Sequence, residues 1–138
     1  MNKKHIVLLI LISIFITTPA FCKGTAESWG ISEKQYKELT EFSKKMHKVK
    51  EKFEKGIAFK KDVKEIIGDP AFILKDKSDW TIQVEGQKDE WQYWHPCYAT
   101  VSYIFIFAEN DMLIMISCRQ LQNPANSFIY YDVDYFLE

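Results

Sequence analysis

The first regular pattern in the chain is a stripe of apolar residues spaced three and four apart. Ser32 followed three residues later by Gln35 forms a capping box. Ile31 and Tyr36 occupy the two positions of a hydrophobic staple, and Gly56 supplies a left-handed residue where the pattern ends. The pattern predicts a helix whose core face consists of Tyr36, Leu39, Phe42, Met46, Val49 and Phe53.

A second, shorter apolar pattern covers Phe59–Ile67. Within it, Val63, Ile66 and Ile67 fall on one side of a helix. The triplet Gly68-Asp69-Pro70 ends this helix, because glycine accepts a left-handed cap and proline cannot continue a helix. We therefore expect two helices, the second of which leads into a strand.

Alternation of apolar and polar residues replaces the helical pattern in the second half of the chain and predicts antiparallel strands. Gly86 marks the turn of a first hairpin, and Glu109-Asn110-Asp111 marks that of a second. The expected strands are 79–85, 90–94, 98–107 and 112–118, and 127–136 is a candidate for a final strand. The predicted fold class is α+β, with two N-terminal helices packed on a three- to four-stranded antiparallel sheet in a two-layer sandwich.

The second hairpin is apolar on both faces, which is the pattern of strands covered on two sides. One face carries Tyr103 and Phe105, whereas the other carries Ile104 and Ile106. Because two helices cover only one face, the other needs the aromatic tail 128–131, a second copy of the chain or a partner protein. We expect the tail to cover it, since large bare apolar patches are rare on monomers.

The N-terminus has the pattern of an export signal. Lys3 and Lys4 precede a largely apolar run, 6–16, that stops at Thr17-Thr18-Pro19 and is too short for a permanent membrane span. The predicted organisation is a signal peptide at 1–22, a tether at 23–30 and a single α+β domain at 31–138.

Cys22 allows a second interpretation of this segment, a bacterial lipoprotein whose acylated cysteine holds the protein at a membrane surface. Pro19 and Phe21 differ from the Leu-like and small residues that usually precede such a cysteine. We expect a mature start between Phe21 and Gly24 and export to the periplasm or another extracytoplasmic compartment. Membrane contact, as an outer-membrane anchor, is expected only if Cys22 is lipidated.

Composition narrows the class of protein. The chain has 138 residues, is 47% hydrophobic and 27% charged, and has a formal net charge of −1, which fits one ordinary globular domain. Near-zero charge gives no reason to expect nucleic-acid binding. Residues 33–65 hold eleven lysines against seven acidic residues, whereas 66–138 hold four basic against eleven acidic ones. We interpret the basic half as the solvated face of a helix, with an acidic surface or anionic lipid as the alternative contact.

Two cysteines remain after the predicted cleavage, Cys97 and Cys118, and export permits a disulfide between them. The hairpin register places Cys118 opposite about Ser102, which leaves Cys97 out of line, so two reduced thiols are the alternative. A metal or thiol enzyme would centre on His95 and Cys97. The sequence has no second ligand pair, nucleophile elbow, phosphate loop or dinucleotide fingerprint, and we expect no catalytic, cofactor or metal site.

Three aromatic residues lie close together near the end of the first predicted hairpin, and we expect some in the core and one at the surface. Alternation places Trp91 and Tyr93 on one face, where we expect core, and Trp94 on the other. Exposed tryptophan anchors many protein interfaces, so Trp94 and its neighbour His95 form the candidate partner surface. The free edge of the sheet is a second candidate, where an extended partner segment adds a strand.

Three motifs in a fixed order connect these elements. They are Gly68-Asp69-Pro70 after a helix, Trp91-Gln92-Tyr93 in a strand, and Tyr103–Phe107 before a polar turn. In order and spacing they resemble the SmpA/OmlA domain, and the resemblance makes Gly68, Pro70, Trp91 and Tyr93 the turn and strand motif of that family.

The resemblance to SmpA/OmlA implies an α+β sandwich of two helices on an antiparallel sheet. Members of that family include an accessory lipoprotein of the outer-membrane β-barrel assembly machine, and related folds act as secreted protein inhibitors. All of these work by binding other proteins.

The sequence as a whole predicts an exported, non-enzymatic protein-interaction module without a cofactor, most like an accessory of outer-membrane or cell-envelope assembly. The alternative is a secreted or periplasmic inhibitor-like protein that binds a specific enzyme. A thiol or metal enzyme centred on His95 and Cys97 is the third hypothesis. In the first two, the partner is another protein.

Overall fold

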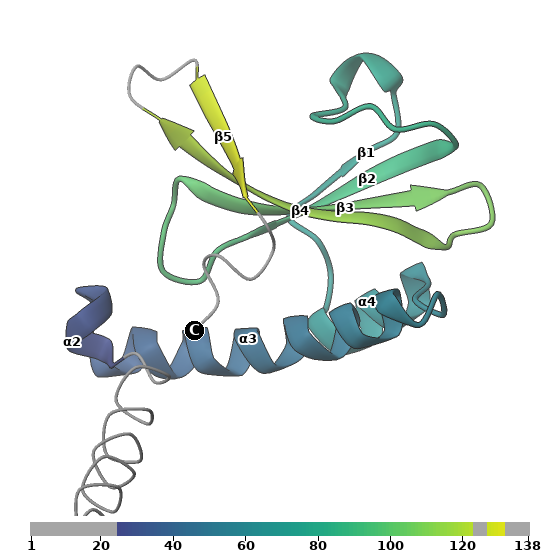
Figure 1. The fold of residues 1–138 in the computed structure, drawn as a ribbon. Coiled ribbons are helices and arrows are strands. Elements are labelled where there is room, and N and C mark those ends of the chain that lie inside the picture. The colour runs from purple at the N-terminus through teal and green to yellow at the C-terminus, as the bar shows by residue number, and fades with distance from the viewer. Residues whose placement is uncertain (1–24, 123–126, 132–138) are drawn as a thin grey trace, which may run out of the picture.

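The computed structural model describes residues 25–122 and 127–131, in which helices precede an antiparallel sheet. Figure 1 shows the long helix α3 (Glu33–Glu54) lying under the sheet, next to the shorter helix α4 (Lys60–Ile67). The α+β class, with its helices placed before its strands, is therefore confirmed.

Helix α3 begins where the capping signals place it. The Ser32 hydroxyl accepts the N–H of Gln35 at 3.2 Å, and the Gln35 side chain accepts the N–H of Ser32 at 3.0 Å. These bonds satisfy donors that the first helical turn leaves open. The chain leaves the helix through Gly56, whose φ of +69° is left-handed as expected. The buried side of α3 consists of Leu39, Ser43, Met46 and Val49.

Residues 23–30, expected to be a tether, contain a short helix in their described part. Helix α2 (Ala26–Trp29) has its own capping box. Trp29 lies against Tyr98, with 6.3 Å between the ring centroids, and the Tyr98 hydroxyl donates to the Trp29 carbonyl at 3.0 Å. This segment packs on the domain because one capping box and one aromatic contact are enough to hold a single helical turn.

Helix α4 has no side-chain cap at its N-cap residue, Phe59, and only the reciprocal bond is present: Asp62 Oδ2 accepts the N–H of Phe59 at 2.9 Å. The helix stops at Gly68, as the Gly-x-Pro triplet predicts. Gly68 has φ +104° and ψ −165°, a conformation almost restricted to glycine. The Tyr93 hydroxyl donates to the Gly68 carbonyl at 2.9 Å, so the turn after α4 is fastened to the sheet.

The sheet contains five antiparallel strands in the described residues, one more than the upper limit we expected, and they follow one another in sequence order. A very short edge strand accounts for the difference. The strands are β1 (Phe72–Leu74), β2 (Gln87–Trp94), β3 (Val101–Ala108), β4 (Leu113–Gln122) and β5 (Ser127–Tyr131). The strand expected at 127–136 is thus present as far as Tyr131, and its remainder lies outside the described residues.

Residues 79–85, expected to be a strand, are instead part of the connection between β1 and β2. The connection starts with a 3-10 turn, η1 (Lys77–Asp79), in which Asp76 Oδ1 accepts the N–H of Ser78 at 3.0 Å. The partner of β2 is β1, which pairs Ile73 with Trp91. The expectation of a hairpin turning at Gly86 was therefore wrong.

A buried carboxylate explains why this segment is not a strand. Glu90 accepts the N–H of Thr81 at 2.9 Å and that of Ile82 at 3.5 Å. A side chain thus satisfies backbone donors that would otherwise need a neighbouring strand. Alternation in the sequence does not distinguish these two ways of pairing the backbone.

The hairpin of β3 and β4 is confirmed, with Phe107 opposite Leu113 as its turn predicts. A bulge beside Phe107 shifts the pairing by one residue, so Cys118 lies opposite Tyr103 and not Ser102. A bulge inserts one extra residue into a strand, and the apolar pattern of this hairpin is too uniform to reveal it.

The sheet face that meets the helices carries the core. Trp91 and Tyr93 are buried there, as predicted. They lie edge-on to Phe107 and Phe105, with ring centroids 5.0 and 5.2 Å apart. Aromatic side chains of this size let a small domain fill its core. The same cluster contains Met46, Val49, Ala58, Val63, Val101, Tyr103, Leu113 and Cys118.

The opposite face, which we call the outer face, is not covered by the aromatic tail as we expected. The tail forms β5, which pairs with β4 as an edge strand of the sheet. A segment hydrogen-bonded within the sheet cannot fold back across it. Figure 1 shows instead that the connection between β1 and β2 rises on the side of the sheet away from α3.

Segment 80–84 of that connection covers the middle of the outer face. Thr81 Oγ1 accepts from Gln92 of β2 at 2.8 Å and from Arg119 of β4 at 3.3 Å, so it spans the intervening strand β3. Ile104 and Ile106 of β3 are fully buried. Both faces of the central strands are therefore covered, as the double-sided apolar pattern predicts.

The predicted signal peptide at 1–22 and Cys22 lie outside the described residues. Within the described residues, no helix combines the length and the apolar character that crossing a membrane requires.

Candidate functional site

Four large aromatic side chains are about half exposed, and all four lie on the outer face. The exposed fractions are 49% for Phe72, 51% for Trp94, 44% for Phe128 and 46% for Tyr130. Strand pairing places them together, because residues directly opposite one another in antiparallel strands point to the same side. Across the sheet, successive partners are Trp94, Ser102, Arg119 and Tyr130. We call the four exposed side chains the aromatic rim.

Trp94 is exposed, as expected for a surface residue, and it does not stand alone. The ring of Phe72 meets it edge-on, with 5.7 Å between the centroids. The contact joins β1 to the end of β2. The sequence analysis missed Phe72 because it did not assign strand β1.

Arg119 lies in the middle of the outer face. Its Nε donates to the Ser102 hydroxyl at 3.1 Å, and its Nη1 donates to Thr81 Oγ1 at 3.3 Å. The guanidinium carbon lies 4.6 Å from the centroid of the Phe128 ring, a cation–π arrangement. Three contacts on three different elements therefore hold its position. Arg119 is the one arginine of the chain, a signal that the sequence analysis did not use.

A buried polar network contacts Arg119 through the hydroxyl group of Thr81. Glu90 is fully buried, and besides the two backbone donors its Oε1 accepts from the Gln92 amide at 2.8 Å. The same amide donates to Thr81, which also accepts from Arg119. Hydrogen bonds make such burial of a carboxylate tolerable, since an unpartnered one is costly.

Two clefts flank Arg119 on the outer face. The larger has a volume of about 400 Å³ and is lined by Thr81, Ile82, Met115, Ser117 and Tyr130. The smaller has a volume of about 190 Å³, and its lining includes Trp94, Arg119, Leu121 and Phe128. The aromatic rim thus forms parts of the walls of both clefts.

His95, predicted to join Trp94 on the surface, is buried instead, with 4% of its surface exposed. Its Nδ1 accepts the N–H groups of Cys97 and Tyr98, at 3.0 and 3.1 Å. Its ring stacks on Tyr98, with 4.8 Å between the centroids. His95 therefore shapes the loop between β2 and β3, because its ring nitrogen takes the place of a backbone acceptor.

The two cysteines are separate thiols, and no disulfide joins them. Cys118 lies in β4 under the helices, where burial raises the pKa of its thiol to about 12. Cys97 Sγ donates to the Gln35 carbonyl at 3.4 Å, and burial together with the charge of Glu38 raises its pKa as well. Nucleophilic cysteines have lowered pKa values, so these environments favour structural roles.

The described residues contain no cluster of three or more His, Cys, Asp or Glu side chains that could hold a metal ion. His95 and Cys97, the one pair singled out from the sequence, are adjacent in space. Their hydrogen bond runs from the Cys97 backbone to the ring and does not involve the thiol.

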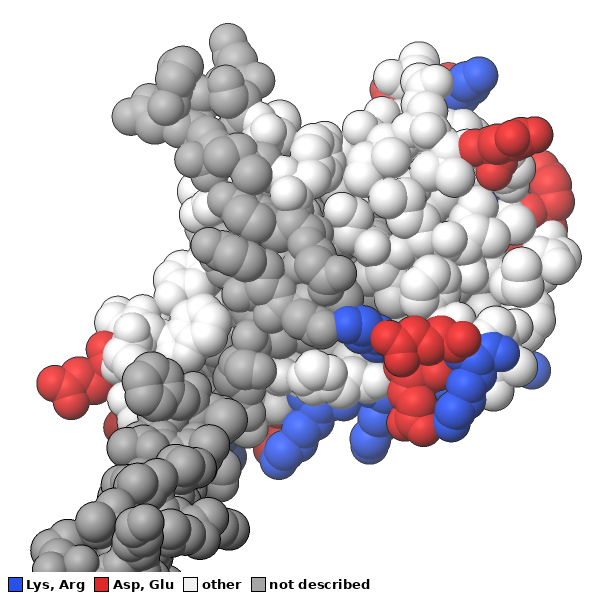
Figure 2. Space-filling model, in the orientation of Figure 1, with Lys and Arg blue, Asp and Glu red and all other residues white. Residues whose placement is uncertain are grey.

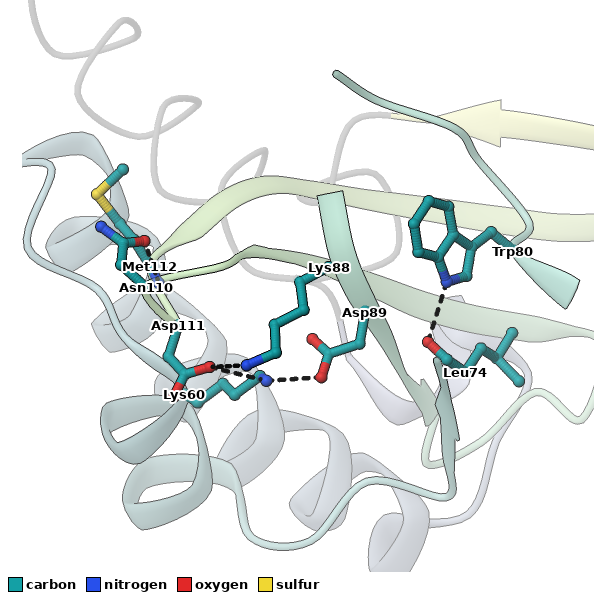
Figure 3. Close-up of polar contacts among 8 residues, drawn as sticks. All are labelled: Lys60, Leu74, Trp80, Lys88, Asp89, Asn110, Asp111 and Met112. Atoms are coloured by element: carbon teal, nitrogen blue, oxygen red, sulfur yellow. Dashed lines mark hydrogen bonds and ion pairs between the residues drawn. The ribbon is translucent and has the colours of Figure 1, made fainter. Parts of the chain in front are cut away.

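Lys60 joins α4 to the sheet through two carboxylates (Figure 3). Its Nζ lies 2.6 Å from Asp89 Oδ2 and 3.0 Å from Asp111 Oδ1. It also lies over the rings of Trp91 and Phe107, 5.9 and 5.6 Å from their centroids. Desolvation opposes the charge, but the hydrogen bonds to Asp89 and Asp111 outweigh it, so the pKa of Lys60 is raised. Its charge is matched inside the fold, and we regard it as an anchor for α4.

Charged side chains gather along the helices and at the right-hand side of the visible surface (Figure 2). Figure 2 shows blue and red side chains along the helices and at the right-hand margin, whereas the body of the sheet above the helices is largely white. On α3, Lys55 and Lys44 lie 2.7 and 3.3 Å from Glu51 and Glu41, one turn away. This pattern fits the interpretation of a solvated basic helix.

Comparison of the chain with family models, with curated proteins and with solved structures found no match in any of the three. The resemblance to the SmpA/OmlA domain therefore stays a prediction from the sequence. The class of protein defined by the fold and the site is a small α+β domain with one face of its sheet buried under helices and an aromatic surface on the other.

Proposed function

We propose that this chain is a non-enzymatic protein-interaction module that binds its partner through the outer face of the sheet. The observation that carries the proposal is the aromatic rim around the fixed guanidinium of Arg119. Tryptophan, tyrosine and arginine contribute most of the binding energy at protein interfaces. The half-exposed state of these rings leaves apolar area for a partner to cover.

The free energy gained by covering the exposed aromatic rings is adequate for specific binding. Covering the exposed half of one large aromatic side chain contributes about 1 kcal/mol, so the rim as a whole contributes several kcal/mol. The contacts of Phe72 with Trp94 and of Phe128 with Arg119 exist before any partner arrives. Such preorganisation lowers the entropic cost of association.

The chemistry of the described residues also supports binding in preference to catalysis. The Nδ1 atom of His95 already accepts two backbone N–H groups, and the thiols of Cys97 and Cys118 have raised pKa values. A Cys/His pair would need a thiolate and a base directed at it. This supports our ranking of the thiol or metal enzyme as the third hypothesis.

We further propose that binding takes place in the cell envelope. The signal-peptide pattern at 1–22 supports export, and the SmpA/OmlA-like order of Gly68, Pro70, Trp91 and Tyr93 supports an accessory role in outer-membrane assembly. An inhibitor-like protein that binds a specific enzyme is the alternative. It would use the same surface and differ in the identity of the partner.

Site-specific photo-crosslinking in the native host tests this proposal. A photoreactive phenylalanine derivative replaces Trp94 in the full chain, and the matched control places it at Ile57, which is equally exposed but lies between α3 and α4. We expect one defined protein adduct from position 94 and no such adduct from position 57. Mass spectrometry of the adduct then identifies the partner.

The identity of the adduct separates the two kinds of partner. A component of the barrel-assembly machine supports the assembly accessory, whereas a soluble enzyme supports the inhibitor-like protein. Absence of an adduct at position 94, or identical adducts at both positions, would contradict binding through the outer face.

A further inference from the structure

Within the described residues, Arg119 differs from Lys60 in forming no ion pair with a carboxylate. Lys60 contacts Asp89 and Asp111. Arg119 donates to the neutral hydroxyl oxygens of Ser102 and Thr81, and it forms no ion pair with any carboxylate in residues 25–122 and 127–131. A partly exposed guanidinium that is held in position but makes no direct ion pair is suited to an anionic group from outside.

The donors of this guanidinium suit a carboxylate in particular. Arginine presents five N–H donors in a planar fork, and the contacts to Ser102 and Thr81 engage Nε and Nη1. The Phe128 ring covers the guanidinium without using a donor. Further donors therefore remain for the two oxygens of a carboxylate.

The clefts on either side of Arg119 indicate which side chains flank that carboxylate in the bound segment. Three successive outer-face side chains of β4 are Ser117, which follows Met115 in the larger cleft, Arg119 between the clefts, and Leu121 in the smaller one. Alternate residues of a strand lie about 6.6 Å apart. An extended peptide above the sheet has the same repeat, so its alternate side chains match these three positions.

We propose that the outer face binds an extended segment of a partner protein with the pattern apolar-x-acidic-x-apolar, whose central carboxylate pairs with Arg119. One apolar side chain fills the larger cleft beside Ile82 and Met115, and the other enters the smaller cleft beside Trp94 and Leu121. The inference deepens the proposed function and rests on it. The charge of the occupant follows from Arg119, and its apolar flanks follow from the lining of the clefts.

Selection from a phage library of random twelve-residue peptides tests the inference. The target is the protein purified as its host processes it, with the variants Arg119→Gln and Trp94→Ala. Lys61→Gln is the matched control, because it removes one positive charge from the exposed side of α4. We expect the wild type and Lys61→Gln to enrich the apolar-x-acidic-x-apolar pattern. Arg119→Gln should still enrich apolar peptides but without the acidic residue.

Affinity measurements on the best peptide complement the selection, and the first of them uses the wild-type protein alone, so it does not depend on how well a variant folds. Replacing its acidic residue by the matching amide should weaken binding to the wild type about tenfold, because a charge-assisted pair is lost. The same change should alter binding to Arg119→Gln less than about twofold.

The outcomes separate this inference from the proposed function. Enrichment without an acidic preference, or an equal preference in Arg119→Gln, overturns the inference and leaves binding by the outer face intact. If the wild type enriches no more peptides than Trp94→Ala, the proposed function fails as well. Dimerisation of the wild type that Arg119→Gln abolishes would assign the surface to a second copy of the chain and overturn the inference.

Discussion

Glu90 is the residue on which the shape of the outer face depends. Its carboxylate is fully buried and accepts from the backbone of Thr81 and Ile82 and from the side chain of Gln92. These bonds hold segment 80–84 over β3 and so place Thr81 against Arg119. One acidic residue thereby links the loop, the sheet and the candidate site.

Glu90→Gln should lower the free energy of unfolding by about 2 kcal/mol, because an amide has one acceptor oxygen and cannot serve both the backbone N–H groups of Thr81 and Ile82 and the side-chain amide of Gln92, so a buried donor is left unpaired. Urea denaturation measures the change. The control Glu85→Gln, an exposed position two residues before the strand begins, should stay within about 0.5 kcal/mol of the wild type. Equal losses in the two variants would contradict the role assigned to Glu90.

Residue-level prediction succeeded for side chains whose environment follows from strand alternation alone. Trp91 and Tyr93 are buried and Trp94 is exposed, as alternation requires. His95 fails because it follows the strand, where alternation stops and a ring nitrogen can replace a backbone acceptor. Arg119 was missed because its importance depends on neighbours from three other elements.

At the scale of elements, the anchoring of α4 to the sheet depends on Lys60. The helix is eight residues long, and Lys60 is its first residue. The ammonium reaches Asp89 of β2 and Asp111 of the β3–β4 turn (Figure 3). Short helices derive most of their stability from such tertiary contacts.

Lys60→Met should destabilise the fold by about 3 kcal/mol, because it leaves the buried carboxylate of Asp89 without its cation. Thermal or urea unfolding measures this. The double variant Lys60→Met with Asp89→Leu should recover most of the loss, since a buried ion pair can be replaced by apolar residues of similar size. Lys61→Met, at the exposed neighbouring position, serves as the control. A double variant as unstable as Lys60→Met would refute this account.

Elements with strong local signals were predicted well, and those decided by side-chain bonds to the backbone were not. The capping box at Ser32 and the glycine at 56 bracket α3 almost to the residue. The alternating residues 79–85 form a loop in which Glu90, eight and nine residues further along the chain, accepts the N–H groups of Ile82 and Thr81. No local pattern encodes that bond.

At the scale of the whole molecule, the two faces of the sheet have different tasks. The inner face packs Trp91, Tyr93 and Phe105 against the helices, whereas the outer face exposes the aromatic rim. The helices carry most of the lysines, and Figure 2 shows the charge concentrated there. The inner face thus carries the aromatic core, whereas the outer face carries the exposed aromatic side chains that we propose as the binding surface.

Processing of the N-terminus decides where this surface is presented. In the native host, we expect an intact mass that corresponds to a start between Phe21 and Gly24 without acyl groups, and a protein that stays soluble in the Cys22→Ala variant. Mass spectrometry with membrane fractionation measures both. A mass raised by acyl chains, with membrane association lost in Cys22→Ala, would establish a lipoprotein instead and strengthen the assembly accessory.

The sequence by itself determined the α+β class, the limits of the long helix, the main hairpin and the core positions of Trp91 and Tyr93. These follow from contacts between residues close in the chain, where periodicity and capping act. Only the tertiary structure decided that the β1–β2 connection covers the outer face, that His95 is buried, and that Arg119 lies among the aromatic rim. Those features depend on side-chain hydrogen bonds and ring contacts, some between neighbours in a loop and others between different elements, and neither periodicity nor capping records them.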